Sequence, residues 1–199
     1  MDATILIYTY KEGLLSKLAH DLRLTVTRFE IIARGTEVTA SIAASSLRID
    51  GVMKDGRLFR DALGGGDLEK IRDNMRDTLR LGEHPEVRFV GRTGSREPPF
   101  SLSGTLTLAG VTQPFSTLLT LRDQRLLGDV EIVPSQWGIK PFRALGGALR
   151  VQDRVRVRID ASATWLDQAG ELNPAVELVW QPATSTPERV KVSSRPPGS

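Results

Sequence analysis

The sequence predicts an all-β protein, mainly antiparallel, that is interrupted once by an amphipathic helix. Three observations support this prediction. Apolar and polar residues alternate with a period of two over most of the chain, turn residues separate the alternating segments, and the period rises to nearly four only at residues 67–79. About eight such segments, joined as near-sequential hairpins with one apolar face each, are typical of an up-and-down barrel or a sandwich.

The N-terminal quarter contains the first strands. Ile5 and Ile7 form one apolar face, and alternate residues of Leu22–Val26 form the next one. The apolar residues then move from even to odd positions at Phe29, which predicts a bulge at Thr27–Arg28. Further strands are expected over residues 38–42 and 46–50, after a turn at residue 35.

One segment departs from this pattern. Three glycines at residues 64–66 interrupt any strand, and the apolar residues that follow have helical spacing: Leu68, Ile71, Met75 and Leu79. Asp67 is placed to act as the N-cap or as an acid of the first turn, and Gly82 ends the helix. We therefore predict a helix over residues 67–79 whose apolar stripe flanks or covers the barrel.

The second half of the chain returns to a period of two. Strands are expected over residues 87–89, 101–108, 115–121, 126–132 and 151–161, with a turn over residues 110–114. Beyond Asp167 the composition shifts to Pro, Ser, Thr and Glu, which predicts a disordered tail over residues 167–199 behind a folded domain of residues 1–166. The apolar cluster at residues 176–180 is the part of this tail suited to dock on the body or on a partner.

Composition and length limit the class of protein. The chain has 199 residues, 40 % of them hydrophobic, and a formal net charge of +3, as expected of one globular domain with a sizeable core. The small and dispersed basic excess gives little support to a nucleic-acid partner, so none is predicted. The absence of cysteine excludes disulfides, thiol nucleophiles and thiolate metal sites.

The hydropathy pattern bears on location. No apolar run approaches the length needed to span a bilayer, and the N-terminus lacks the apolar core of a signal peptide. We therefore expect no transmembrane segment and a cytoplasmic protein, or a periplasmic one if a leader has been removed. The oligomeric state stays open, a homodimer included.

Candidates for catalysis are few. The chain has two histidines and lacks a nucleophile elbow, a phosphate loop, metal-ligand spacing and a dinucleotide fingerprint, so neither a metal nor a cofactor is predicted. His20 precedes Asp21, but neighbouring residues on a strand point to opposite faces, which disfavours a pairing between them. His84 precedes Pro85 in a turn and is expected to be solvated or to cap that turn.

Two basic features allow other interpretations. The glycines before the helix and its basic C-terminal end allow a phosphate cradle or contact with lipid headgroups, although a solvated helix face is favoured. Arg154, Arg156 and Arg158 form a stripe on one strand face. No aromatic residues interleave with them, which favours a solvated sheet surface over nucleic-acid binding.

The interior of the predicted barrel is the feature that bears most on function. A barrel of about eight strands is just wide enough either to fill itself with side chains or to hold one small ligand. The inward residues include several small ones, namely Ala33, Ala40, Gly104 and Gly128, which are expected to leave room. A cavity and a tightly packed core are both compatible with this pattern.

Six motifs follow one another in a specific order. They are Gly-Leu-Leu-Ser-Lys-Leu-Ala-His-Asp-Leu at residues 13–22, the helix at 67–79, His-Pro-Glu-Val-Arg-Phe at 84–89, Ser-Gly-Thr-Leu-Thr-Leu-Ala-Gly-Val-Thr-Gln-Pro at 103–114, Trp-Gly-Ile at 137–139, and the strand at 151–159. In this order they resemble the YceI-like family. The resemblance runs from about Ile5 to Trp165, and the shared order is more specific than any single motif.

The resemblance implies an extended lipocalin-like barrel whose lumen holds a long apolar molecule, such as a polyisoprenoid, an isoprenoid quinone or a fatty amide or acid. The predicted lining residues are Leu24, Phe29, Ile31, Phe89, Leu106, Phe115, Leu119, Val130 and Val157, with His20, Trp137 and Phe142 at the mouth or against a headgroup. A non-catalytic carrier or store is the leading hypothesis. The alternatives are a stress-response or protein-interaction scaffold with a filled barrel, and an enzyme that acts on a lipid-like substrate through a histidine.

Overall fold

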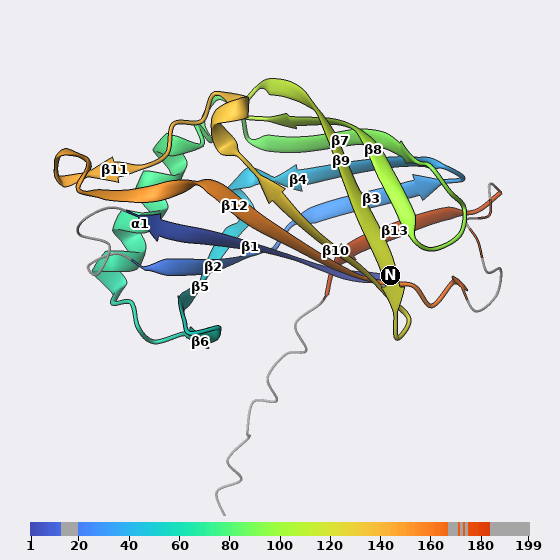
Figure 1. Cartoon of the computed structure of the whole chain (residues 1–199), viewed down its shortest axis with the longest axis horizontal. Coiled ribbons are helices and arrows are strands. Elements are labelled where there is room, and N and C mark those ends of the chain that lie inside the picture. Colours follow the sequence, from blue (N-terminus) through green and yellow to red (C-terminus); the bar gives the residue numbers. More distant parts are fainter. Residues whose placement is uncertain (13–19, 167–170, 172, 174, 184–199) are drawn as a thin grey trace, which may run out of the picture.

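The computed structural model describes residues 1–12, 20–166, 171, 173 and 175–183 (Figure 1). Its strands belong to one hydrogen-bonded sheet. They are β1 (Asp2–Glu12), β2 (Asp21–Val26), β3 (Phe29–Arg34), β4 (Glu37–Ala43), β5 (Leu47–Lys54), β6 (Arg57–Phe59), β7 (Glu86–Thr93), β8 (Phe100–Leu108), β9 (Val111–Arg122), β10 (Arg125–Ile132), β11 (Arg143–Ala144), β12 (Leu149–Ser162) and β13 (Glu177–Pro182). The helices are α1 (Gly65–Thr78) and the short 3-10 turns η2 (Ala44–Ser46), η3 (Pro134–Trp137) and η4 (Leu145–Gly147).

The sheet closes on itself. Its order runs β12, β10, β9, β8, β7, β4, β3, β13 and β1, and the pairing of β1 with β12 joins the two ends. That antiparallel pairing extends from Ala3 opposite Ala161 to Glu12 opposite Arg150. The ring removes the free edges that an open sheet would expose. The predicted barrel with one helix is therefore confirmed, and it contains nine strands in the ring.

The extra strand of the ring is β13, and the prediction of a disordered tail is wrong for residues 177–182. The expectation that the apolar cluster of this tail docks on the body is confirmed. Residues 177–180 pair with β3 in antiparallel fashion, and Gln181 and Pro182 pair with the start of β1 in parallel. Leu178 and Trp180 are buried, and the Trp180 Nε1 donates a hydrogen bond of 2.8 Å to the Ser162 carbonyl. The polar composition of the whole tail concealed this short alternation, and residues 184–199 of the tail lie outside the described part.

The same strand explains why the predicted bulge at Thr27–Arg28 is wrong. β2 ends before these residues and pairs with β1 and β5, whereas β3 begins after them and pairs with β4 and β13. Because β13 occupies the edge of β1 at Asp2 and Ala3, the chain bends away from β1 and continues on the far side of β13. The change of parity marks the passage between two separate strands.

The predicted helix is present as α1 and stands across one end of the barrel (Figure 1). Gly64 is its N-cap and provides no side-chain hydrogen bond, so Asp67 is an acid of the first turn and not the cap. No residue of α1 is buried. Just beyond its C-terminal end, the Arg80 guanidinium donates a hydrogen bond of 2.6 Å to the Ala109 carbonyl, which ties this end to the turn between β8 and β9.

That turn is shorter than the predicted one. It consists of Ala109 and Gly110, both with positive φ, and β9 begins at Val111. Pro114 therefore lies inside β9, opposite Thr105. A proline is tolerated there because the pairing of β9 with β10 covers only residues 119–122, so its missing N–H has no carbonyl to meet on that edge.

The contribution of β13 can be measured with Trp180→Ala. We expect this change to lower the free energy of unfolding by roughly 3–5 kcal/mol, because it removes a large buried ring and leaves a cavity. Gln181→Ala, on the exposed face of the same strand, is the control and should change the free energy by no more than about 0.5 kcal/mol. Urea unfolding of the full chain measures both, and equal effects would contradict the structural role of β13.

Candidate functional site

The barrel encloses a cavity of about 700 Å³. Inward-facing residues of the ring strands and of β2 line it, and alternate positions of each strand contribute, as the pleat requires. Most of the lining is aliphatic or aromatic. The scaffold hypothesis expects side chains to fill the interior, and the cavity contradicts this expectation.

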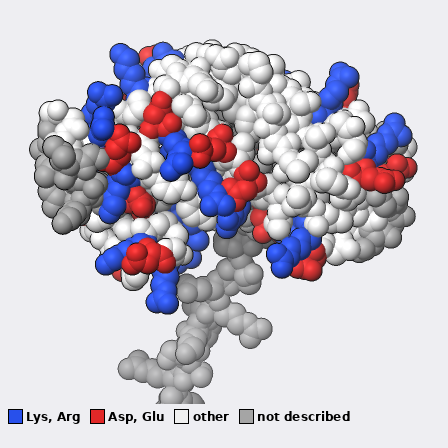
Figure 2. All heavy atoms as spheres, viewed as in Figure 1, with Lys and Arg blue, Asp and Glu red and all other residues white. Residues whose placement is uncertain are grey.

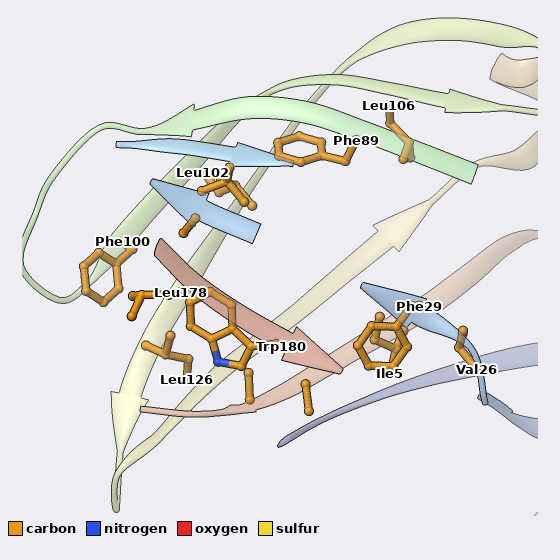
Figure 3. Close-up of a cluster of buried hydrophobic side chains, with 14 of the residues drawn as sticks. Ile5, Val26, Phe29, Phe89, Phe100, Leu102, Leu106, Leu126, Leu178 and Trp180 are labelled. Atoms are coloured by element: carbon orange, nitrogen blue, oxygen red, sulfur yellow. The ribbon is translucent and has the colours of Figure 1, made fainter. Parts of the chain in front are cut away.

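The cavity has two different ends. At the mouth lie Ile71, Met75 and Leu79 of the helical stripe, which confirms that α1 flanks the lumen, whereas Leu68 does not reach it. At the opposite end, the floor, Phe100 and Trp180 are buried beside Leu126 and Leu178 (Figure 3). The cavity therefore has a half-exposed end beside α1 and a packed end opposite it.

All but two of the predicted lining residues contact the cavity. These are Leu24, Ile31, Phe89, Leu106, Phe115, Leu119, Val130, Val157, His20 and Phe142. Phe29 is instead buried in the core, at the bend where β3 begins. Trp137 is buried in η3, and its Nε1 donates a hydrogen bond of 2.9 Å to the Leu106 carbonyl. Neither side chain lines the lumen, so these two assignments are wrong as to position; whether the others bind a ligand stays a prediction.

The small residues account for the space only in part. Ala33 and Ala40 line the cavity, as expected. Gly104 lies opposite Gly91, and a Cβ on Gly104 would come within 2.2 Å of the Val90 carbonyl oxygen, so this glycine allows two strands to approach closely. The room at Gly128 is taken by the Leu119 side chain, whose Cδ2 would lie 2.6 Å from an added Cβ. The expectation that these two glycines enlarge the lumen is therefore wrong.

Several lining residues were not predicted, although strand parity could have found some of them. Thr93 follows Phe89 on the inward face of β7, and Thr117 lies between Phe115 and Leu119 on the inward face of β9. Trp165 follows β12 and has no such pattern to identify it, because only the closed ring brings it to the floor. The prediction from the sequence selected apolar inward positions, so these two threonines were not included.

The mouth carries polar and basic groups. Lys11, His20, Lys70 and Arg150 line it, and Arg150 forms an ion pair of 2.8 Å with Glu12. The Asp21 carboxylate accepts a hydrogen bond of 2.8 Å from the Lys11 backbone N–H. His20 is exposed and lines the cavity, whereas Asp21 does not line it. The two adjacent residues therefore lie on different faces, as the strand geometry predicted. Residues 13–19 of the first motif lie outside the described part.

The second histidine is half-buried and also lines the cavity. His84 packs against Gly110, where a Cβ would come within 2.4 Å of its Cε1. A carboxylate oxygen of Glu83 lies 3.8 Å from its Nε2, which is longer than a hydrogen bond. The imidazole is thus only partly solvated, because one side of it packs against the turn between β8 and β9.

The other features considered in the sequence have local explanations. The Asp67 carboxylate occupies the first turn of α1, where it adds negative charge at the end that a phosphate would need. In the part of the chain that the structure describes, no cluster of three or more His, Asp or Glu side chains is suited to a metal ion. Among the described helices, none combines the length and apolar character required to cross a membrane.

The arginine stripe on β12 is paired on the outer surface. Arg156 and Arg158 both donate to the Asp129 carboxylate, and Arg154 lies 3.5 Å from Glu131. Figure 2 shows acidic and basic side chains intermixed on this face. The hydrogen bonds from Arg156 hold the pKa of Asp129 below its ordinary value. The stripe is thus a solvated and largely paired sheet surface, and the solvated surface is what the sequence favoured.

The rings of two tyrosines add to this surface. The Arg154 guanidinium lies 5.3 Å from the centre of the Tyr10 ring, and that of Arg158 lies 5.9 Å from the centre of the Tyr8 ring. Both tyrosines are on β1, next to β12 in the ring. These cation–π contacts support the same seam of the barrel that the backbone pairing closes.

A closed antiparallel barrel with one helix at its mouth and an apolar lumen defines a lipocalin-like protein with a fold suited to ligand binding. Residues 13–163 match the family model of the YceI-like domain, and the chain belongs to this family. β13 lies beyond the matched residues.

One solved structure gives the same result for the fold. The chain is similar to BcnA of Burkholderia cenocepacia, with 12 % sequence identity, a TM-score of 0.52, and coverage of 79 % of this chain and 94 % of that one. It is also similar to the YceI protein of Campylobacter jejuni, with 11 % identity, a TM-score of 0.41, and coverage of 67 % and 80 %. Among curated proteins, none matches this sequence.

The ion pairs of the outer seam predict a pH dependence. Asp129→Asn should lower the free energy of unfolding by about 0.5–1 kcal/mol near neutral pH, because it removes an exposed paired carboxylate. The pKa of Asp129 is lower in the folded state, so its stabilisation is present above about pH 4 and is lost as the pH falls through the folded pKa.

Urea unfolding at about pH 7 and about pH 3 checks this sign. The difference between wild type and Asp129→Asn should shrink at the acidic pH. Glu131→Gln, which loses a single longer contact of 3.5 Å, is the matched control and should have a smaller effect. A difference that stays constant with pH would contradict the assignment.

Proposed function

We propose that this protein binds one long apolar molecule in its barrel and carries or stores it without chemical change. A polyisoprenoid, an isoprenoid quinone or a fatty amide or acid is the proposed ligand class. The observation that supports this most directly is the cavity of about 700 Å³ with an aliphatic and aromatic lining. Membership of the YceI-like family, which is known for polyisoprenoid binding, supports the same ligand class.

The size and chemistry of the lumen agree with one enclosed ligand. Pockets that hold small molecules have volumes of roughly 300–1,000 Å³. Binding would derive mainly from burial of apolar surface, at about 25 cal/mol per Å² before the ordering costs of the ligand.

The helix offers a route for the ligand. α1 and its C-cap residue Leu79 border the mouth with three apolar residues, yet none of the residues of α1 is buried. An element that buries little apolar surface can move away from its neighbours at a small cost in free energy. We therefore assign α1 the role of a movable flank, with Lys11, Lys70 and Arg150 close to the polar end of a ligand that remains at the mouth.

The lumen can be blocked to test binding. Ala40→Phe places a ring in the cavity from β4, and we expect it to weaken ligand binding by roughly tenfold, or about 1.4 kcal/mol. Thr39→Phe adds the same ring to the outer face of the same strand and is the matched control, with binding unchanged. Titration with a fluorescent isoprenoid measures affinity, and solvent extraction followed by mass spectrometry identifies any lipid carried by the purified protein.

Two outcomes would contradict the proposal. If no lipid is extracted from the wild type and the fluorescent isoprenoid does not bind it, the carrier function is wrong. If Ala40→Phe and Thr39→Phe bind equally well, the ligand occupies another surface. Circular dichroism of both variants shows whether the barrel is intact.

A further inference from the structure

We propose that the mouth end of the barrel docks on an anionic lipid surface through two projecting hairpins, β5–β6 and β11–β12, and exchanges its apolar ligand there. The headgroups of such a surface carry phosphate charges. This inference rests on the proposed function, because a long apolar molecule leaves water for a lipid phase and must pass from that phase into the barrel.

Both hairpins extend past the last pairs of the strands that carry them. The β1–β12 pairing ends with Glu12 opposite Arg150, and β11 pairs with only the first two residues of β12, so the turn at residues 145–148 lies beyond the seam. The β2–β5 pairing ends with Asp21 opposite Met53, and the β5–β6 turn follows it. Figure 1 shows β11, α1 and β6 at the same end of the barrel, on the left. The two hairpins therefore project at the mouth.

Apolar side chains lead from the lumen to both hairpins. Leu22 lines the cavity, its partner on β5 is Val52, and the partner of Val52 on β6 is Phe59. Residues directly opposite each other in antiparallel strands share a face, so this row continues the inner wall outward. It ends at Phe59, which is 47 % exposed. Beside the other hairpin, Phe142 before β11 and Leu149 at the start of β12 line the cavity and continue its apolar wall to the rim.

The exposed side chains of these hairpins are mostly basic. Residues 132–152 contain no acidic residue, and Lys140 and Arg143 in this segment are exposed. The β5–β6 hairpin and the residues just after it add three exposed cations and two acids, namely Lys54, Arg57, Arg60, Asp55 and Asp61. Within the part of the chain that the structure describes, no ion pair joins any of these five cations to a carboxylate. The rim therefore keeps cations available for an anionic partner.

Other basic surfaces of the barrel lack this combination. On β12 the outward arginines are matched by Asp129 and Glu131, which leaves little charge to attract an anion. α1 carries four acids and three bases and adds no positive excess at the mouth. Unpaired cations beside an exposed ring, at the opening of an apolar lumen, suit a lipid surface: its phosphates attract the cations, and its acyl region accepts the ring.

Vesicle co-sedimentation tests the docking. Phosphatidylcholine vesicles that contain phosphatidylglycerol should bind the wild type, pure phosphatidylcholine vesicles should bind it much more weakly, and added salt should reduce the difference. In the double variant Lys140→Gln/Arg143→Gln, we expect partitioning to the anionic vesicles to fall by roughly tenfold to thirtyfold, as for the loss of two cations at such a surface. Arg92→Gln/Arg96→Gln removes two exposed cations from β7 and the loop after it and is the matched control, with binding unchanged.

A tryptophan at the rim tests the apolar contact. The emission of Phe59→Trp should shift to shorter wavelength when anionic vesicles are added, because the indole leaves water for the lipid interface. Leu118→Trp, at a residue 51 % exposed on β9, is the control and should show no shift. The wild-type spectrum gives the contribution of the three native tryptophans.

The outcomes separate docking from ligand carriage. If the wild type binds a fluorescent isoprenoid in solution but neither kind of vesicle, docking is wrong and the carrier function stands. If anionic vesicles bind it and the isoprenoid does not, the carrier function is wrong, and ligand exchange at the lipid surface with it. Equal losses in the two double variants would overturn the assignment to the mouth. If the emission of Phe59→Trp already lies at short wavelength without vesicles and the chain elutes as a dimer, a second copy covers this surface and docking on lipid is wrong.

Discussion

The pairing of β1 with β12 is the constraint on which the rest of the structure depends. It joins the first strand of the chain to one that lies about 150 residues later, and it turns a row of hairpins into a ring. Its register places Ile5 opposite Ile159 and Ile7 opposite Val157, so that both members of each pair face the lumen. The same register places the Arg158 guanidinium beside Tyr8 on the outer surface. The paired strands thus carry charged, largely paired side chains on their outer face and apolar side chains on their inner face.

The cavity persists because the two ends of the barrel are packed differently. At the floor, Phe100, Trp180 and Trp165 converge from β8, β13 and the segment that follows β12, and the rings of Phe100 and Trp165 pack with their centres 6.3 Å apart. Along the wall, alanines occupy inward positions on β3 and β4, and at the mouth α1 borders the opening without burying any of its own residues. The packed floor gives the barrel its stability, and the loosely covered mouth gives a ligand access.

The polar groups differ between the outer surface and the interior of the barrel. The arginines of β12 are matched by carboxylates on the outer surface, where water screens whatever remains unpaired. Inside, the unpaired groups of the floor are neutral, namely a hydroxyl and an indole N–H. Both atoms have almost no accessible surface, so a molecule in the lumen would meet mainly the apolar lining. Its affinity would therefore come mainly from the apolar area that it buries.

The sequence by itself determined most of the strands, the helix and most of the apolar lining, because period two and period four are local properties of the chain. Parity alone placed Phe89, Leu106 and Phe115 inside the barrel. Only the tertiary structure decided what depends on closure. It showed that residues 177–182 complete the ring, that Phe29 and Trp137 lie away from the lumen, and that neighbouring strands or side chains take the space at Gly104 and Gly128.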